Sequence, residues 1–252
     1  MTDRFQASLV IPCFNEERQI GDTLRTVATF IGDRGLPWQV VPVDDGSTDA
    51  TKDLLLQAAK DHPFVRPVLL PANRGKGGAL AQGVRDCSSG AVVFFDADLS
   101  YPLEAIEPAL AALRDGADLV IGARDLVPAA SPNHPRQWVR RLTSAGFSAL
   151  VDHYLHLGIP DTQCGFKAFK GPVARALFAC LTVERFAFDV ELLALARRWN
   201  LAIHRMPVTP IQRATSSVRL VKDSLEMWRA LARVRRRLDQ GAYPATMPSE
   251  PP

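Results

Sequence analysis

The sequence predicts an α/β fold in which a mainly parallel β-sheet is flanked by helices. In the first half of the chain, short apolar runs alternate with amphipathic segments. The apolar runs are typical of strands covered on both faces, and the amphipathic segments have helical periodicity. This alternation favours right-handed crossovers between parallel strands. Hydrophobic residues make up 47% of the 252 residues and charged residues 23%, the balance of a globular protein with a sizeable core.

Five short apolar runs in the first half are expected to form strands. They are Ala7–Ile11, Trp38–Val43, Val65–Leu70, Ala91–Phe95 and Ala117–Gly122. Helices are expected between them at residues 16–31, 49–60 and 77–87. In the first of these, apolar side chains recur at three- and four-residue spacing, and Ser47 or Thr48 is the expected N-cap of the second. Pro102 is expected to open the next helix, because proline is tolerated in a first turn.

The second half is expected to be more helical. Helices are predicted at residues 136–157, 186–199 and 217–238, with a late strand at 202–208. The chain is expected to form one domain over residues 1–238, with a nucleotide-binding half at 7–125 and an acceptor-binding half at 126–238. Residues 239–252 are rich in small residues and proline, and are expected to be a disordered tail.

The sequence carries no feature of a secreted or membrane-spanning protein. The four cysteines form no CxxC pair, which favours reduced thiols. No apolar stretch approaches the roughly 18 residues needed to cross a bilayer. A cytoplasmic protein is therefore expected, and binding to the inner face of a membrane is left open.

The last predicted helix is strongly basic. Eight basic residues and two acidic ones lie between Arg213 and Arg237, beside an apolar stripe. This combination fits a helix lying on an anionic membrane. A helix whose stripe packs against its own domain, with solvated arginines, explains the same pattern.

Polar motifs follow each of the five predicted strands. They occupy residues 15–16, 44–47, 73–76, 96–98 and 124–125. Ligands of open α/β sheets collect beyond the carboxyl ends of the strands. All five motifs are therefore expected on one ligand-binding edge.

Asp96-Ala97-Asp98 is a candidate metal site. Two carboxylates at a strand end repel each other, and Mg²⁺ or Mn²⁺ shared with a diphosphate would relieve that repulsion. An Asx-type turn before the helix at Pro102 is the simpler explanation for the motif taken alone. Its position after the fourth strand favours the metal site.

Two further motifs have competing explanations. Asp44-Asp45-Gly46-Ser47 offers a carboxylate to a nucleotide base, but Asp-Gly-Ser is also common turn chemistry. Gly75-Lys76-Gly77-Gly78 has Leu80 where a dinucleotide fingerprint needs glycine, and lacks the Gly-Lys-Ser/Thr of a P-loop. A dehydrogenase or P-loop NTPase is therefore disfavoured.

Pairs of metal-ligating or acidic residues in the second half are weaker signals. His153 and His156 have helical metal spacing without an evident third ligand, so packing or surface histidines are expected. Asp189 and Glu191 fall on different faces of a helix, and both a structural role and a site role remain open.

The ordered set of motifs resembles the family 2 glycosyltransferases of GT-A fold, over roughly residues 7–235. The motifs are VIPCFNEE, VDDGSTD, NRGKGGAL, FFDADLS, GARD, DTQCGFKAF and FAFDVELL. DTQCGFKAF and VRLVKDSLEMW are most similar to dolichyl- or polyprenyl-phosphate glucosyltransferases, followed by the mannosyl-phosphate-dolichol synthases. The resemblance implies a Rossmann-like sheet, a nucleotide-sugar donor and Mg²⁺ or Mn²⁺.

The resemblance also implies roles for matching residues. On the donor side, the base, ribose, diphosphate and metal would be contacted by Pro12, Asn15, Glu16, Asp44, Asp45, Lys76, Asp96, Ala97 and Asp98. Asp45 would hydrogen-bond the base, and Asp96 and Asp98 would hold the metal. Arg124, Arg140 and Arg141 would face the acceptor phosphate, and Gln163 and Lys167 would lie near the transferred sugar or diphosphate.

The expected reaction is inverting transfer of a hexose, glucose from UDP-glucose, to a polyprenyl or dolichyl phosphate at a membrane surface. A phosphate monoester is mostly ionised at neutral pH, so this acceptor needs cations and no general base. GDP-mannose as donor, a soluble hydroxyl acceptor and a degenerate nucleotide-binding regulatory protein are the alternatives. A nucleotidyltransferase is disfavoured, because PCFNEE replaces its glycine-rich loop after the first strand. No nucleic-acid partner is expected, and a homo-oligomer is left open.

Overall fold

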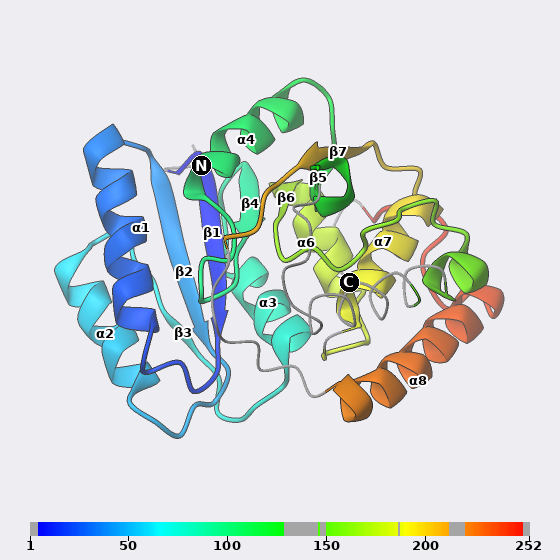
Figure 1. Cartoon of the computed structure of the whole chain (residues 1–252), viewed down its shortest axis with the longest axis horizontal. Helices are drawn as coiled ribbons and strands as arrows, with labels where there is room; N and C mark the ends of the chain where they lie inside the picture. Colours follow the sequence, from blue (N-terminus) through cyan, green and yellow to red (C-terminus); the bar gives the residue numbers. More distant parts are fainter. Residues whose placement is uncertain (1–4, 129–145, 147–149, 186, 212–219, 249–252) are drawn as a thin grey trace.

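A seven-stranded sheet forms the centre of the computed structural model (Figure 1). The structure describes residues 5–128, 146, 150–185, 187–211 and 220–248, and the side chains of all of these except 220–226. The strands are β1 (Ala7–Cys13), β2 (Trp38–Asp44), β3 (Val68–Leu69), β4 (Ala91–Phe94), β5 (Leu119–Ala123), β6 (Lys167–Lys170) and β7 (Ile203–Pro207). Their order in the sheet is β3-β2-β1-β4-β6-β5-β7.

The sheet is mainly parallel, as expected, with one antiparallel strand. β1 pairs in parallel with β2 and β4, and β5 pairs in parallel with β7. β6 lies antiparallel between β4 and β5. No strand was expected at β6, because it is short and begins and ends with a lysine, Lys167 and Lys170. Through β6, the second half of the chain completes the sheet begun by the first half.

Helices cover both faces of the sheet, as the alternation of segments predicts. In chain order they are α1 (Ile20–Arg34), α2 (Thr51–Asp61), α3 (Lys76–Arg85), α4 (Ile106–Arg114), α6 (Gly171–Ala179), α7 (Phe188–Arg198) and α8 (Leu220–Asp239). Consecutive residues of β1 face opposite sides. Leu9 joins the apolar core beneath α1, α2 and α4, and Val10 joins the core beneath α3, α6, α7 and α8.

Some boundaries differ from the expected ones. β3 has two residues, because it is an edge strand, and Val65 makes only an isolated bridge to Val40. Pro102 precedes a short 3-10 helix, η1 (Leu103–Ala105), which leads into α4. Of the helix expected at 136–157, residues 146 and 150–155 are helical. Residues 136–145 and 147–149 lie outside the described part of the chain.

The expected disordered tail is wrong for residues 240–248, which pack against α7. Tyr243 is buried, and its hydroxyl donates to Glu191 Oε1 over 2.5 Å. The Pro244 carbonyl accepts hydrogen bonds from Arg198 Nε and Trp199 Nε1, both at 3.0 Å. The composition of this segment predicted disorder, but the buried ring of Tyr243 and the hydrogen-bonded carbonyl of Pro244 hold it in place. Residues 249–252 lie outside the described part.

The apolar stripe of α8 packs against the domain. This is the second of the two arrangements that its sequence allowed. Leu231 and Val234 are buried. Trp228, Arg229, Arg233 and Arg236 are exposed, and α8 runs along the outside of the molecule (Figure 1). Among the described helices, none has the length and apolar character that crossing a bilayer requires.

Candidate functional site

Loops after β1 and β2 are hydrogen-bonded to each other at the carboxyl edge of the sheet. The Asn15 amide N–H donates to Ser47 Oγ over 2.9 Å, and the Thr48 N–H donates to Asn15 Oδ1 over 2.9 Å. The Glu16 N–H donates to Thr51 Oγ1 over 2.7 Å. Asn15 has a φ of 55°, a left-handed conformation that asparagine tolerates. Two of the expected polar motifs therefore form one surface, with Pro12 half-buried at its base.

Asp45 joins this surface to the glycine-rich loop after β3. Its two carboxylate oxygens accept hydrogen bonds from Asn73 Nδ2 (2.9 Å), the Arg74 N–H (2.7 Å) and the Gly75 N–H (2.8 Å). Burial raises the pKa of Asp45, against the effect of these donors. The structure thus gives Asp45 a role in holding this loop, where base recognition was expected. Asp44 Oδ1 accepts from the Ser47 N–H over 3.1 Å, which is the turn chemistry considered for this motif.

Glycines in this loop allow a close approach by the segment before α7. Gly75 has a φ of 87°, and a Cβ at Gly77 would lie 2.7 Å from Phe188 Cβ. The Gly78 N–H donates to the Glu184 carbonyl over 3.0 Å. Side chains would push these backbones apart, so the glycines serve packing here.

Asp96 lies between a cation and a glycine. Its Oδ1 forms an ion pair with Lys76 Nζ. A Cβ at Gly165 would lie only 2.3 Å from its Oδ2, so the carboxylate rests against the Gly165 backbone. Asp96 thereby connects the end of β4, the start of α3 and the segment that leads into β6.

Asp98 forms the turn considered as an alternative to a metal site. Its Oδ1 accepts from the Ser100 N–H over 2.9 Å and from Ser100 Oγ over 2.6 Å. Leu99, between them, has a φ of 48°. The carbonyl of the intervening Ala97, itself buried, accepts from Thr23 Oγ1 over 2.6 Å. The turn fixes Asp98 close to Asp96, and one carboxylate oxygen can serve the turn while the other serves a ligand.

Negative charge is concentrated at this edge. Burial raises the pKa of Glu16; Gln19 opposes this, and the carboxylates of Asp98, Asp49 and Asp96 add to it. Burial would lower the pKa of Lys76, but Asp96, Asp189 and Asp98 outweigh it and raise that pKa. Neighbouring carboxylates contribute to both shifts, and this local concentration of negative charge suits a divalent cation. Within the described part of the chain, no three His, Cys, Asp or Glu side chains form a ready metal cage, so phosphate oxygens would have to supply further ligands.

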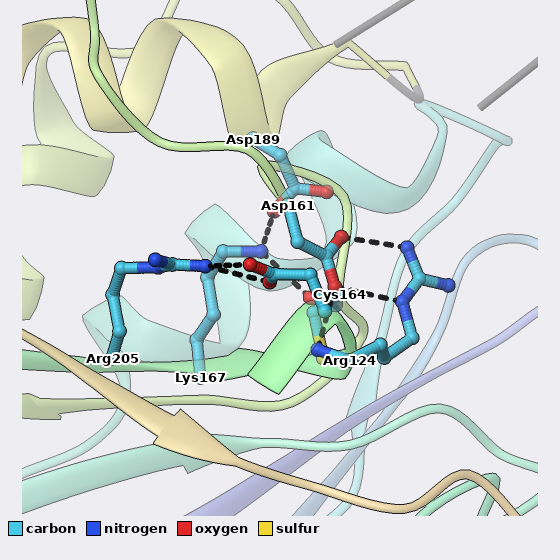
Figure 2. Close-up of polar contacts among 7 residues, drawn as sticks. Arg124, Asp161, Cys164, Lys167, Asp189 and Arg205 are labelled. Atoms are coloured by element: carbon cyan, nitrogen blue, oxygen red, sulfur yellow. Dashed lines mark hydrogen bonds and ion pairs between the residues drawn. The ribbon is translucent and has the colours of Figure 1, made fainter. Parts of the chain in front are cut away.

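A second polar group lies beyond β5, where η2 (Arg124–Leu126) begins (Figure 2). Arg124 donates through Nε (2.8 Å) and one terminal nitrogen (2.7 Å) to the Asp161 carboxylate, and its backbone N–H adds a third bond of 3.0 Å. Asp125 is paired with Arg205 of β7 at 2.5 Å. The three bonds to Asp161 hold Arg124 in one orientation, and a third of its side chain is exposed. Arg140 and Arg141 lie outside the described residues.

The structure corrects the expected placement of Lys167. This residue begins β6, its side chain is fully buried, and Nζ donates to the Cys164 carbonyl and to Asp189 Oδ1, both over 2.7 Å (Figure 2). It contacts the site through Asp189 instead of facing a sugar or diphosphate directly. Burial raises the pKa of Asp189, although Lys167 and Lys76 oppose that effect. Gln163 is half-buried beside this group.

Three residues of the site were not anticipated from the sequence: Asp161, Gly165 and Glu184. Asp161 and Gly165 belong to DTQCGFKAF, so the motif marked the segment without marking these positions. Asp189 turns toward Lys167, whereas Glu191 has a structural role, accepting from the N–H groups of Thr182 and Val183 and from two hydroxyls. His153 is exposed, and its ring packs edge-on against Tyr154, as expected for a surface histidine.

Comparison with known proteins gives a match to the family described as Glycosyl transferase family 2, over residues 8–178. Dolichyl-phosphate beta-glucosyltransferase of Dictyostelium discoideum is 30% identical over 253 residues, which cover 96% of this chain and 77% of that protein. The dolichyl-phosphate beta-glucosyltransferases of Saccharomyces cerevisiae and Homo sapiens are each 32% identical over 94% of this chain, and over 76% and 77% of their own lengths.

Solved structures share the fold at lower identity. Mannosyl-3-phosphoglycerate synthase from Rubrobacter xylanophilus has a TM-score of 0.68 and 19% identity, over 95% of this chain and 76% of its own. Glucosyl-3-phosphoglycerate synthase from Mycobacterium tuberculosis, in complex with Mn²⁺, UDP and glucosyl-3-phosphoglycerate, has a TM-score of 0.63 and 22% identity, over 91% of this chain and 78% of its own. These similarities confirm the expected GT-A fold.

Proposed function

Because the chain belongs to glycosyltransferase family 2, we propose that it transfers glucose from UDP-glucose to the phosphate of a polyprenol or dolichol, with inversion at the anomeric carbon. The relatives named dolichyl-phosphate beta-glucosyltransferase support this acceptor. The observation that carries the proposal is the placement of Asp96 and Asp98 at the carboxyl end of β4, in an edge with excess negative charge. Such an edge suits the metal diphosphate of a nucleotide sugar.

Asp96 and Asp98 would hold Mg²⁺ or Mn²⁺ against the donor diphosphate. The ion, when bound, neutralises the charge that builds on the leaving diphosphate as the glycosidic bond breaks. The surface formed by Asn15 and Ser47 would border the base together with Pro12 and Glu16, and Asp44 and Asp45 would lie beside it. Lys76 lies close enough to Asp96 to reach the same diphosphate.

The acceptor side would bind a phosphate through Arg124. Asp161 engages Nε and one terminal nitrogen of the guanidinium, which leaves the other terminal nitrogen to donate to an anion. The acceptor oxygen is already ionised, so no base is required. Asp161 balances the charge of Arg124, so further cations are needed to bring two anions together, and we assign that role to Arg140 and Arg141. Gln163, beside this group, would contact the transferred sugar.

Transfer assays would test the donor and acceptor together. UDP-glucose with a polyprenyl phosphate should give product, whereas the unphosphorylated polyprenol and soluble sugars should not. A stronger signal with GDP-mannose would favour the mannosyl alternative, and transfer to a soluble hydroxyl would replace the lipid phosphate as acceptor. Full transfer activity in the presence of EDTA would contradict the proposed requirement for a divalent metal ion.

Asp98→Asn should lower transfer by at least about a hundredfold, because charge stabilisation at the leaving group is a large catalytic contribution. Asp115→Asn, at an exposed position after α4, is the matched control and should keep full activity. Circular dichroism and thermal unfolding would verify that both variants fold. An active Asp98→Asn enzyme would remove this residue from the reaction.

We further propose that the protein meets its lipid acceptor by binding an anionic membrane through the exposed face of α8. That face presents Trp228 beside Arg229, Arg233 and Arg236, a pattern that fits the interface of an anionic bilayer.

Flotation with vesicles containing anionic lipid would test this membrane contact. Reversing the charges of Arg229, Arg233 and Arg236 to glutamate should weaken binding by at least about tenfold, since each basic residue contributes on the order of 1 kcal/mol. The same reversal at the exposed Arg18, Arg85 and Arg114 is the control. Equal losses in both triple variants would argue against a specific role of α8.

A further inference from the structure

Lys76 forms an ion pair with the carboxylate of Asp96, which the proposed metal also requires as a ligand. It is the first residue of α3, and its Nζ is paired with Asp96 Oδ1. The other oxygen of Asp96 rests against the Gly165 backbone, so the carboxylate has little room to turn away from the lysine. An ammonium and a divalent ion would therefore compete for Asp96.

The surroundings of Lys76 favour a cation even when no metal is present. Asp96, Asp189 and Asp98 all stabilise its positive charge. Only a fifth of its side chain is exposed, so water screens these attractions weakly. Without an ammonium here, the edge would hold the carboxylates of Asp96 and Asp98 unbalanced in the empty protein.

A further buried carboxylate, that of Asp189, also interacts with the charge of Lys76. Asp189 is almost fully buried, and Lys167 donates to its Oδ1. Its charge interacts with both lysines. A lysine that left Asp96 would remain in an acidic environment, within reach of an incoming diphosphate.

We propose that Lys76 is a tethered cation that neutralises Asp96 in the empty site and yields it to the divalent ion when the nucleotide diphosphate binds. The displaced ammonium then pairs with the diphosphate. This inference rests on the proposed function, because it takes the metal and the diphosphate to bind at Asp96. It implies that the free protein binds metal weakly and that nucleotide and metal bind cooperatively.

The test is Mn²⁺ binding to the whole protein, measured by electron paramagnetic resonance of the unbound ion, with and without UDP. Without UDP, Lys76→Met should bind Mn²⁺ roughly tenfold more tightly than the natural protein, which corresponds to a competition of about 1.4 kcal/mol. UDP should tighten Mn²⁺ binding strongly in the natural protein and much less in the variant. Lys60→Met, at an exposed position of α2, should change neither value.

Two further variants keep the test decisive. Lys76→Arg retains the charge and should bind Mn²⁺ as weakly as the natural protein. If Lys76→Met does not fold without metal, Lys76→Gln replaces it, and Mn²⁺ should raise its melting temperature more than that of the natural protein.

The outcomes separate this inference from the proposed function. Lys76→Met or Lys76→Gln that binds Mn²⁺ no more tightly than the natural protein would overturn the tethered cation. If Asp96→Asn abolishes Mn²⁺ binding in that case, the metal site of the proposed function still stands. Unchanged Mn²⁺ binding by Asp96→Asn in the presence of UDP would overturn both.

Discussion

The carboxylate of Asp96 owes its position to a neighbour that has no side chain. Gly165 allows the backbone leading into β6 to touch Asp96 Oδ2, while Lys76 holds Oδ1 from the opposite segment. Three stretches of the chain that are far apart in sequence therefore meet at one acidic group. At the residue scale, the position of the Asp96 carboxylate therefore depends on Gly165 as well as on Asp96 itself.

Gly165→Ala should leave the fold intact and lower transfer by about a hundredfold, the loss that a displacement of about 1 Å can cause. The three atoms nearest to the new Cβ all belong to side chains, with the Asp96 carboxylate first, so the clash should displace that carboxylate without disturbing the backbone fold. Transfer assays and thermal unfolding, compared with Gly32→Ala in α1, would separate the two effects, because a Cβ at Gly32 meets no atom within 4 Å. A fully active Gly165→Ala enzyme would contradict the tight contact.

The pairing of Asp161 with Arg124 should make stability depend on pH. Burial would raise the pKa of Asp161, but the hydrogen bonds and charge of Arg124 outweigh it and lower that pKa. A lowered pKa in the folded state contributes stability above the ordinary aspartate pKa of about 3.9, and this contribution disappears as the pH falls through the folded-state value.

Asp161→Asn should lower the free energy of unfolding by about 1–3 kcal/mol at pH 7, less than for a fully buried pair because a third of the Arg124 side chain is exposed. The difference from the natural protein should shrink below about pH 4. Urea unfolding at several pH values would measure it, with the exposed Asp33→Asn as control. A difference that stays constant with pH would exclude the ion pair as its source.

At the scale of elements, α3 and the segment before α7 form a single unit around the glycine-rich loop. Gly75 and Gly77 approach that segment closely, and the Gly78 N–H donates to the Glu184 carbonyl. The ion pair of Arg74 with Glu184 adds to this contact. The loop in turn bonds to Asp45, so the start of α3 is held from both sides. This unit places Lys76 opposite Asp96.

Gly77→Ala should destabilise the protein by about 1–3 kcal/mol, since its Cβ would press on Phe188 Cβ and on two backbone carbonyls that cannot easily move. Urea unfolding would measure the loss. Gly21→Ala in α1 is the control, because its Cβ would make only an ordinary contact at 4.0 Å. Equal stability of the two variants would show that the loop has more room than the structure indicates.

The sequence predicted the elements with a regular pattern and missed those that depend on distant partners. Apolar runs and a helical stripe located β1, β2 and α1, because burial imposes those periods directly. β6 was missed, since its lysines pair with acidic partners far away in the chain: the buried Lys167 with Asp189, and the partly exposed Lys170 with Asp118. The edge carrying Asp96 and Asp98 followed from strand order, but the contact with Gly165 could not, because no local pattern encodes it.

At the scale of the whole molecule, the C-terminal segment fastens α7 to the rest of the fold. Glu191 accepts from the Thr182 and Val183 N–H groups at 2.9 and 2.7 Å, and from the Tyr243 hydroxyl. Burial, with the adjacent Glu191, raises the pKa of Tyr243 to about 12, so this hydroxyl stays a donor throughout the neutral range. Thr182 and Val183 lead directly to Glu184, next to the glycine-rich loop.

Tyr243→Phe should lower the free energy of unfolding by about 1–3 kcal/mol, the value of a hydrogen bond to a charged acceptor. Urea unfolding would measure it, with Thr246→Ala, at an exposed position of the same segment, as control. If Tyr243→Phe is as stable as the control, residues 240–248 contribute little to the fold.

The place of β6 in the sheet has a consequence for synthesis on the ribosome. β4 is complete at Phe94, but its second edge stays uncovered until Lys167–Lys170 has been translated. An open strand edge is prone to pair with other chains, and nascent proteins with such edges depend on chaperones. The growing chain therefore has to be protected over more than a quarter of its length, and a product terminated before Lys167 would be a substrate for aggregation or proteolysis instead of a smaller working enzyme.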